Sequence, residues 1–349
     1  MTTPTEGSES GEPELPRPAD AGAAPEPAAP RPGPVGASTF TIEGRSAPAL
    51  FVVGWLATLL GLGLVVVGVL SGGGSSMLGL LVVGLVLLSI GLVAAAGSQG
   101  IERRTRGVPG YAGPSPLLVF VASVPVSLLA IIVVAVPLGL ADVSLDGPLG
   151  ALLSVIVQAG VYITLIRLLV VDTGALDWRA MGIRALDRHA IAAMSAGALL
   201  ALPVIVATLL VALVLLAIFQ VTPESPLPPT GEPVGFALSL LAGALVAPFG
   251  EEILFRAFAT TAWVRGVGVW WGVTRAAILF AFAHVLTTSG TSAGDALGLA
   301  AVNFGTRVPV ALALGWLFVR RGTIWASFGL HAAFNAVLLV LAEVANRSV

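Results

Sequence analysis

The stretch ALFVVGWLATLLGLGLVVVGVL, residues 49–70, contains no charged side chain and indicates the fold class. About 20 consecutive apolar residues are enough for a helix to cross the hydrocarbon core of a bilayer. Within that core every backbone polar group must be bonded inside the protein, and a helix meets this condition by itself. The stretch therefore predicts a transmembrane helix.

The rest of the chain repeats this pattern, with short polar breaks between the apolar runs. Of the 349 residues, 56% are hydrophobic and only 10% are charged, whereas a soluble chain carries about a quarter charged residues. The sequence therefore predicts an all-α polytopic transmembrane helical bundle of about nine spans, embedded in a lipid bilayer. The further spans are predicted near residues 77–97, 117–140, 149–171, 192–217, 235–257, 275–294, 297–319 and 323–345.

The first 47 residues differ from the rest of the chain, because prolines and acidic residues replace the large apolar ones. Such a segment buries too little apolar surface to offset the entropy of ordering, so we expect a disordered tail over residues 1–47. We divide the remainder into N-terminal transmembrane helices, residues 48–190, and a second transmembrane region, residues 191–349, which contains the polar motifs described below.

Among the breaks between the predicted spans, basic residues occur only in every second one. The positive-inside rule places such breaks in the cytoplasm, so the N-terminus is predicted to be cytoplasmic. All 17 basic residues are arginines, and the chain is rich in alanine, glycine and proline, which favours a GC-rich bacterial source and hence a bacterial cell membrane. The arginines of these breaks are Arg103, Arg104, Arg106, Arg179, Arg184, Arg188, Arg265, Arg275, Arg320 and Arg321.

Composition also excludes several kinds of chemistry. The chain has no cysteine, so a disulfide framework, a thiolate nucleophile and a cysteine-ligated metal are all excluded. Its charges are sparse and scattered, and we therefore expect no nucleic-acid partner.

A few polar side chains nevertheless fall inside predicted spans. Ionisable groups are costly in a membrane and usually mark a function or a partnered structural site. The main ones are Glu251, Glu252, Arg256, His284, His331 and Asn335, and Asn303 and Arg307 are lesser examples in the eighth span.

The spacing of these residues predicts how they pair. Glu252 and Arg256 are four residues apart and share a helical face, whereas Glu251 is rotated about 100° away. We therefore expect Arg256 to hold Glu252 and Glu251 to point elsewhere. At about 1.5 Å per residue, three spans bring the glutamates, His284 and His331 to one depth, roughly 10–14 Å below the cytoplasmic surface.

Each of these features also has a plain structural explanation. A glutamate–arginine pair can lock two helices together, and a single membrane histidine can be a hydrogen-bonded packing residue. The chain, however, has only three histidines, and two of them are predicted at the depth of the glutamates. The third, His189, lies at a loop end. This coincidence favours a functional site.

Three short motifs carry a resemblance to a known family. EEILFR (residues 251–256) fits EExxxR, FAFAH (residues 280–284) fits FxxxH, and HAAFN (residues 331–335) fits HxxxN. In this order they resemble the CPBP family of intramembrane proteases, which includes type II CAAX prenyl endopeptidases and bacteriocin-processing, Abi-like proteins. The resemblance covers residues 235–345 and departs at Ala257, where many relatives have glycine.

The resemblance implies hydrolysis of a peptide bond in the membrane, at a site that opens to the cytoplasm. It implies that Glu251 activates water beside His284 and that His331 and Asn335 stabilise the oxyanion. The implied catalytic residues are Glu251, Glu252, His284, His331 and Asn335, and the site-shaping residues are Arg256 and Phe280. The substrate would be a membrane-associated peptide or protein, either CAAX-like or a precursor.

The use of a metal is left open by the sequence. The family is often labelled metalloprotease, and zinc held by Glu251, His284 and His331 with an open water position is chemically reasonable. A metal-free glutamate mechanism is comparably plausible, because the motif is not HExxH.

Two functions of other classes compete with the protease. A non-catalytic immunity or scaffold protein could use the Glu/Arg/His cluster as a structural lock, although a lock needs neither histidine. A proton-coupled carrier would be expected to show an internal repeat, and the sequence shows none.

Overall fold

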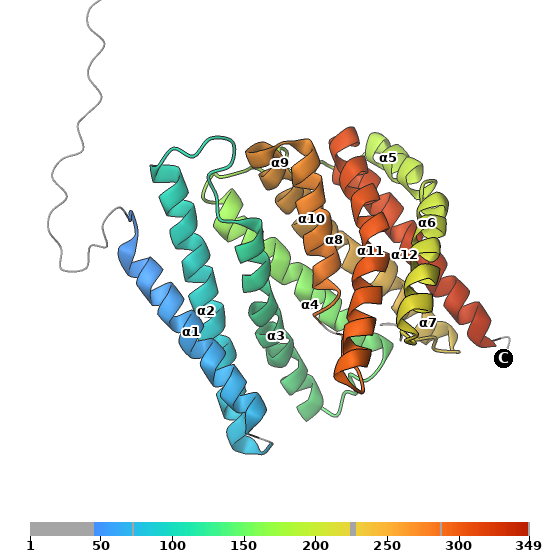
Figure 1. The fold of residues 1–349 in the computed structure, drawn as a ribbon, viewed down its shortest axis with the longest axis horizontal. Coiled ribbons are helices and arrows are strands. Elements are labelled where there is room, and N and C mark those ends of the chain that lie inside the picture. Colours follow the sequence, from blue (N-terminus) through green and yellow to red (C-terminus); the bar gives the residue numbers. More distant parts are fainter. Residues whose placement is uncertain (1–44, 72, 224–227, 287, 348–349) are drawn as a thin grey trace, which may run out of the picture. The chain divides into compact units, whose positions relative to one another are not determined.

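The computed structural model describes residues 45–71, 73–223, 228–286 and 288–347, and the regular structure within them is entirely helical (Figure 1). This confirms the predicted all-α fold. Most of the predicted tail, residues 1–44, lies outside the described residues. The division between residues 48–190 and 191–349 stays a prediction.

Local sequence explains where several helices begin. Proline is favoured in the first turn because its missing N–H has no partner there to lose. Proline accordingly opens α1 (Pro48–Leu70), α3 (Pro116–Leu140), α4 (Pro148–Ile166) and α7 (Pro233–Leu240). The side chain of Ser292 accepts a hydrogen bond from the Asp295 amide and thereby caps α11 (Ala293–Arg321).

The fifth predicted span is two helices rather than one. α5 (Arg188–Ala198) is capped by the Asp187 carboxylate, and α6 (Ala201–Phe219) follows after a break at residues 199–200. Pro203 lies four residues after Leu199 and cannot donate to its carbonyl, so the α-helical ladder is interrupted here. The break between α5 and α6 therefore has a local cause.

The sixth predicted span, residues 235–257, is part of one longer helical segment that runs from residue 233 to residue 267. α7 continues into a π-helix, η2 (Leu241–Val246), then α8 (Ala247–Glu251), a second π-helix, η3 (Glu252–Thr260), and α9 (Thr261–Val267). A shorter π-helix, η1 (Arg167–Val171), extends α4. π-Helices are rare and occur often at functional sites.

Eight helical segments of the described residues are long and apolar enough to cross a membrane. The predicted span at residues 275–294 is not among them, because α10 (Val269–Ala283) has only 15 residues and a length of about 22 Å. It starts earlier than predicted, after Gly268, and ends before His284. α2 (Ser75–Thr105), α11 and α12 (Ile324–Arg347) are full-length segments.

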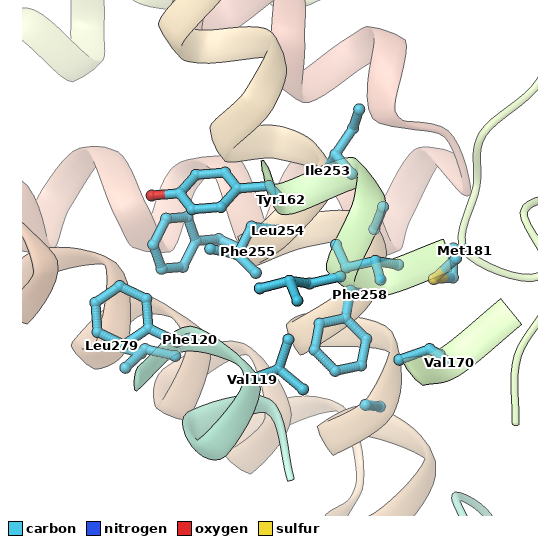
Figure 2. Close-up of a cluster of buried hydrophobic side chains, with 14 of the residues drawn as sticks. Val119, Phe120, Tyr162, Val170, Met181, Ile253, Leu254, Phe255, Phe258 and Leu279 are labelled. Carbon is cyan, nitrogen blue, oxygen red and sulfur yellow. The ribbon is translucent and has the colours of Figure 1, made fainter. Parts of the chain in front are cut away.

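α3, α4, η3 and α10 form the centre of the apolar core. Figure 2 shows Phe255 and Phe258 of η3 among side chains of α3, α4 and α10, including Phe120, Tyr162 and Leu279. The rings of Phe120 and Phe255 lie 5.9 Å apart between their centroids. Helices outside the region of resemblance therefore pack directly on the segment that carries the EExxxR motif.

Glycines set the distance between α1 and α2. Gly54, Gly61 and Gly68 recur every seven residues on α1, and Gly84 and Gly91 have the same spacing on α2. A Cβ on Gly61 would lie 2.5 Å from the Leu88 amide nitrogen, so the two backbones are nearly in contact. Small residues at such spacing permit close van der Waals packing of helices in a membrane.

We expect Gly61→Leu to destabilise the protein by more than the 1–3 kcal/mol typical of overpacking, because backbone atoms of α2 occupy the space. The measurement is thermal unfolding in detergent. Gly63→Leu is the matched control, since a Cβ on Gly63 meets no atom within 4 Å. Equal melting temperatures for the two variants would contradict this account of the α1–α2 contact.

Candidate active site

η3 is buried along its whole length and carries the second glutamate of the motif. Glu252 is fully buried, and every other residue of η3 is buried as well. Its π-helical hydrogen bonds join residues five apart, and the Thr260 hydroxyl donates to the Phe255 carbonyl in the same register, at 2.8 Å. A buried charge in this position needs partners close by.

Arg256 and His331 are those partners. The Nε of Arg256 lies 3.5 Å from Oε1 of Glu252, which gives the predicted ion pair. Nδ1 of His331 lies 3.0 Å from the same oxygen. The guanidinium carbon of Arg256 also stacks 4.3 Å from the centre of the Phe280 ring, so α10 helps to hold the pair.

The hydrogen bond to Glu252 fixes the orientation of the His331 ring. Nδ1 donates to Glu252, so in a neutral ring Nε2 is the acceptor. Nε2 faces Glu251, whose Oε2 lies 3.5 Å away. His331 thus stands between the two glutamates, so α12 contacts the EExxxR motif.

The two glutamates have different surroundings. The side chain of Glu251 is 17% exposed, and that of Glu252 is completely buried. Glu251 makes no contact with Arg256 within 4 Å among the described residues, in agreement with the predicted division between them. Glu251 is therefore the glutamate that solvent or a substrate can reach.

His284 lies at the end of α10 rather than inside a span. Its Nδ1 is 2.8 Å from the Phe280 carbonyl oxygen, and because a carbonyl only accepts, Nδ1 carries the hydrogen. In a neutral ring this leaves Nε2 free to accept a proton. The Phe280 ring contacts both histidines, with ring centroids 4.6 Å from His284 and 5.7 Å from His331.

Asn335 contacts the backbone of η2. Its Nδ2 donates to the Gly243 carbonyl at 2.7 Å. In the π-helical register the donor for that carbonyl would be residue 248, which is proline and has no N–H. Asn335 supplies the missing donor, and its amide group retains one further hydrogen. This backbone role was not predicted from the sequence.

Arg307 of α11 is a site residue to which the sequence reasoning gave no role. It is partly buried and lies within electrostatic reach of both Glu251 and His284. The sequence gives one hint of its role: Arg307 is the one basic residue in the predicted span 297–319. Glu251 lies 3.5 Å from Nε2 of His331, and its charge acts on both His284 and Arg307.

His189 lies apart from these residues, as predicted. It is exposed in the first turn of α5, next to the capping residue Asp187. Two of the three histidines therefore belong to the site and the third does not.

The donors proposed for zinc were tested against the same geometry. Within the described residues, no three histidine, aspartate or glutamate side chains are grouped so that they could hold a metal ion. The set Glu251, His284 and His331 does not form such a group in this arrangement. The zinc alternative stays a prediction.

Comparison with known protein families identifies the same part of the chain. The family described as type II CAAX prenyl endopeptidase Rce1-like matches residues 233–337, which include all three motifs. Residues 233–337 are an Rce1-like domain, consistent with the CPBP family. The domain is of the CAAX-type intramembrane protease class. No curated protein and no solved structure matches the chain.

The Rce1-like domain extends from α7 into α12 and includes every predicted site residue. Helices before it complete the packing around the glutamates. A Cβ on Gly250, next to Glu251, would lie 2.8 Å from the Cβ of Ala159 on α4. The domain thus depends on α4 for the position of α8.

The burial of Glu252 predicts which variants lose stability. Glu252→Gln removes the charge that balances Arg256, and breaking a buried pair costs about 3–5 kcal/mol. Glu251→Gln should leave stability nearly unchanged, because its side chain is partly exposed and has no arginine partner within 4 Å. The melting temperatures in detergent of Glu252→Gln, Arg256→Gln and Glu251→Gln measure this. A Glu251→Gln variant that melts lowest would contradict the assignment.

Proposed function

We propose that this protein is an intramembrane endopeptidase that hydrolyses a peptide bond with water activated by Glu251. The observation that carries the proposal is the difference between two adjacent carboxylates. Glu252 is fully buried and bonded to structural partners, whereas Glu251 is partly exposed and faces Nε2 of His331. The Rce1-like domain supports this class of reaction.

The proposed chemistry uses the polar groups around Glu251. The carboxylate takes a proton from water as the water oxygen attacks the peptide carbonyl carbon. Negative charge develops on the carbonyl oxygen, where the second amide hydrogen of Asn335 and the guanidinium of Arg307 are candidate stabilising groups. The carbon–nitrogen bond then breaks, and the proton held by Glu251 passes to the leaving amine.

The histidines act as proton carriers in this scheme. Hydrogen bonds fix Nδ1 of each ring, to Glu252 for His331 and to the Phe280 carbonyl for His284. Both Nε2 atoms are therefore available to accept and return a proton near Glu251. Such fixed rings need no reorientation during the reaction, which favours catalysis.

The proposed substrate is a membrane-associated peptide or protein, either CAAX-like or an unmodified precursor. The arginines of the breaks place the N-terminus and the opening of the site in the cytoplasm by the positive-inside rule. A peptide would therefore enter from the cytoplasmic leaflet. The proposed location is the cell membrane of a bacterium.

The lock function explains only part of the cluster. A scaffold accounts for Glu252 and Arg256 and also for His331, contrary to the expectation that a lock needs neither histidine, because His331 is buried and hydrogen-bonded to Glu252. It gives no reason for a second, partly exposed carboxylate or for His284 beside it. We therefore favour the protease.

Glu251→Gln should lower peptide cleavage by about 10²–10⁴-fold, the usual contribution of a general base, because an amide cannot take the proton of water. The measurement is cleavage of a membrane-peptide library by purified protein, with and without a chelator. Glu232→Gln, at an exposed glutamate just before α7, is the matched control and should leave turnover intact. Full activity in Glu251→Gln would overturn the proposed mechanism.

A further inference from the structure

A cavity at the arginine-rich end of the helices lies apart from the site. It has a volume of about 340 Å³ and is lined by α9, the end of α11 and the connection between η1 and α5. Figure 1 shows this connection passing beside α9 on its way from α4 to α5. Three arginines line it: Arg179, Arg184 and Arg265.

The connection is fixed in place around the cavity. The Ile324 amide donates to the Gly182 carbonyl at 3.1 Å, and the Trp325 indole donates to the Arg184 carbonyl at 3.0 Å. Gly182 has a φ of +72°, which side chains with a Cβ rarely adopt, so the turn is specific to glycine. The backbone that carries Arg179 and Arg184 is thus tied to the start of α12.

Within the described residues, the three guanidinium groups form no ion pair. In the parts of the chain that the structure describes, no carboxylate lies within 4 Å of Arg179, Arg184 or Arg265. All three side chains are exposed. Their cavity therefore concentrates positive charge with no acidic side chain of the described residues paired to it.

The acidic residues of the same connection are engaged elsewhere. The Asp177 carboxylate accepts from the Ala180 amide at 2.8 Å, and the Asp187 carboxylate accepts from the Ala190 amide at 2.9 Å. The Ala190 amide lowers the pKa of Asp187 below its usual value. Asp172 lies 3.7 Å from Arg167. These carboxylates have other partners, so the guanidinium groups of the cavity can bind an anionic ligand.

We propose that this cavity binds a phosphate group through Arg179, Arg184 and Arg265. The planar guanidinium presents paired N–H groups that match two phosphate oxygens, and several arginines around one cavity suit a multiply charged oxygen ligand. The positive-inside rule places this end at the cytoplasmic leaflet, where anionic phospholipids gather beside basic pockets. The phosphate belongs to such a headgroup or to a free phosphate ion.

Thermal unfolding of the full-length protein in neutral detergent tests this site and distinguishes the two sources. Phosphatidylglycerol, phosphatidylcholine and inorganic phosphate are titrated separately, because a ligand of the folded state raises the melting temperature in a saturable way. We expect saturation with phosphatidylglycerol and none with phosphatidylcholine. Saturation with inorganic phosphate instead would assign the site to a free phosphate ion.

Two double variants of equal charge show whether the cavity is responsible. Arg179→Gln/Arg265→Gln removes two lining arginines, and Arg320→Gln/Arg321→Gln removes two from the end of α11 that do not line it. The first should raise the half-saturating ligand concentration by about tenfold or more, and the second should not. Native mass spectrometry should show the same loss of bound phospholipid or phosphate. An equal effect of both variants, or no saturable ligand at all, would overturn the proposal.

Discussion

The hydrogen bond between Nδ1 of His331 and Oε1 of Glu252 joins the EExxxR motif to the last helix, and the geometry of the site depends on it. A carboxylate that is completely buried is costly unless it is paired and hydrogen-bonded. Arg256 supplies the opposite charge, and His331 supplies the donor from another helix. Because buried Glu252 needs this donor, α12 must lie where His331 can reach Glu252.

Two π-helices place the polar groups of this segment. In η2 the Gly243 carbonyl has no backbone donor, because residue 248 is proline and has no N–H. The side-chain amide of Asn335 on α12 donates to this carbonyl instead. η3 begins directly after Glu251, so the two glutamates lie on either side of the change from α- to π-helix. Asn335 and His331 therefore both join α12 to this segment through polar contacts.

The helices that precede the Rce1-like domain support this arrangement rather than merely adding spans. Phe120 of α3 packs on Phe255, and Ala159 of α4 lies against Gly250. α1 and α2 in turn pack through their glycines. The position of Glu251 is therefore fixed by contacts on both sides of the motif, from α4 and from α12.

Much of the fold and part of the site could be predicted from the sequence. Long apolar runs are strong signals, because a membrane imposes both length and helicity. The pairing of Glu252 with Arg256 followed from their spacing, and the rarity of histidine pointed to His284 and His331. These signals are local or compositional, so they do not require knowledge of tertiary packing.

Other features could not be predicted, since they depend on contacts between distant residues. The short α10 lies within a continuous apolar run, and only the structure shows that it ends before His284. The hydrogen bond from Asn335 to the Gly243 carbonyl forms because the π-helical donor of that carbonyl would be a proline. The sequence alone does not show where π-helices form. Arg307 approaches Glu251 only when α11 packs beside η3.

A double-mutant cycle on Glu252 and His331 tests the central claim most directly. The unfolding free energies of Glu252→Gln, His331→Phe and the double variant are measured in detergent and compared with those of the unchanged protein. If the two residues form the bond that holds η3 to α12, the double variant should be more stable than the sum of the single losses predicts, with a coupling of at least about 1.5 kcal/mol. Additive losses would show that Glu252 and His331 act independently, and would contradict the account.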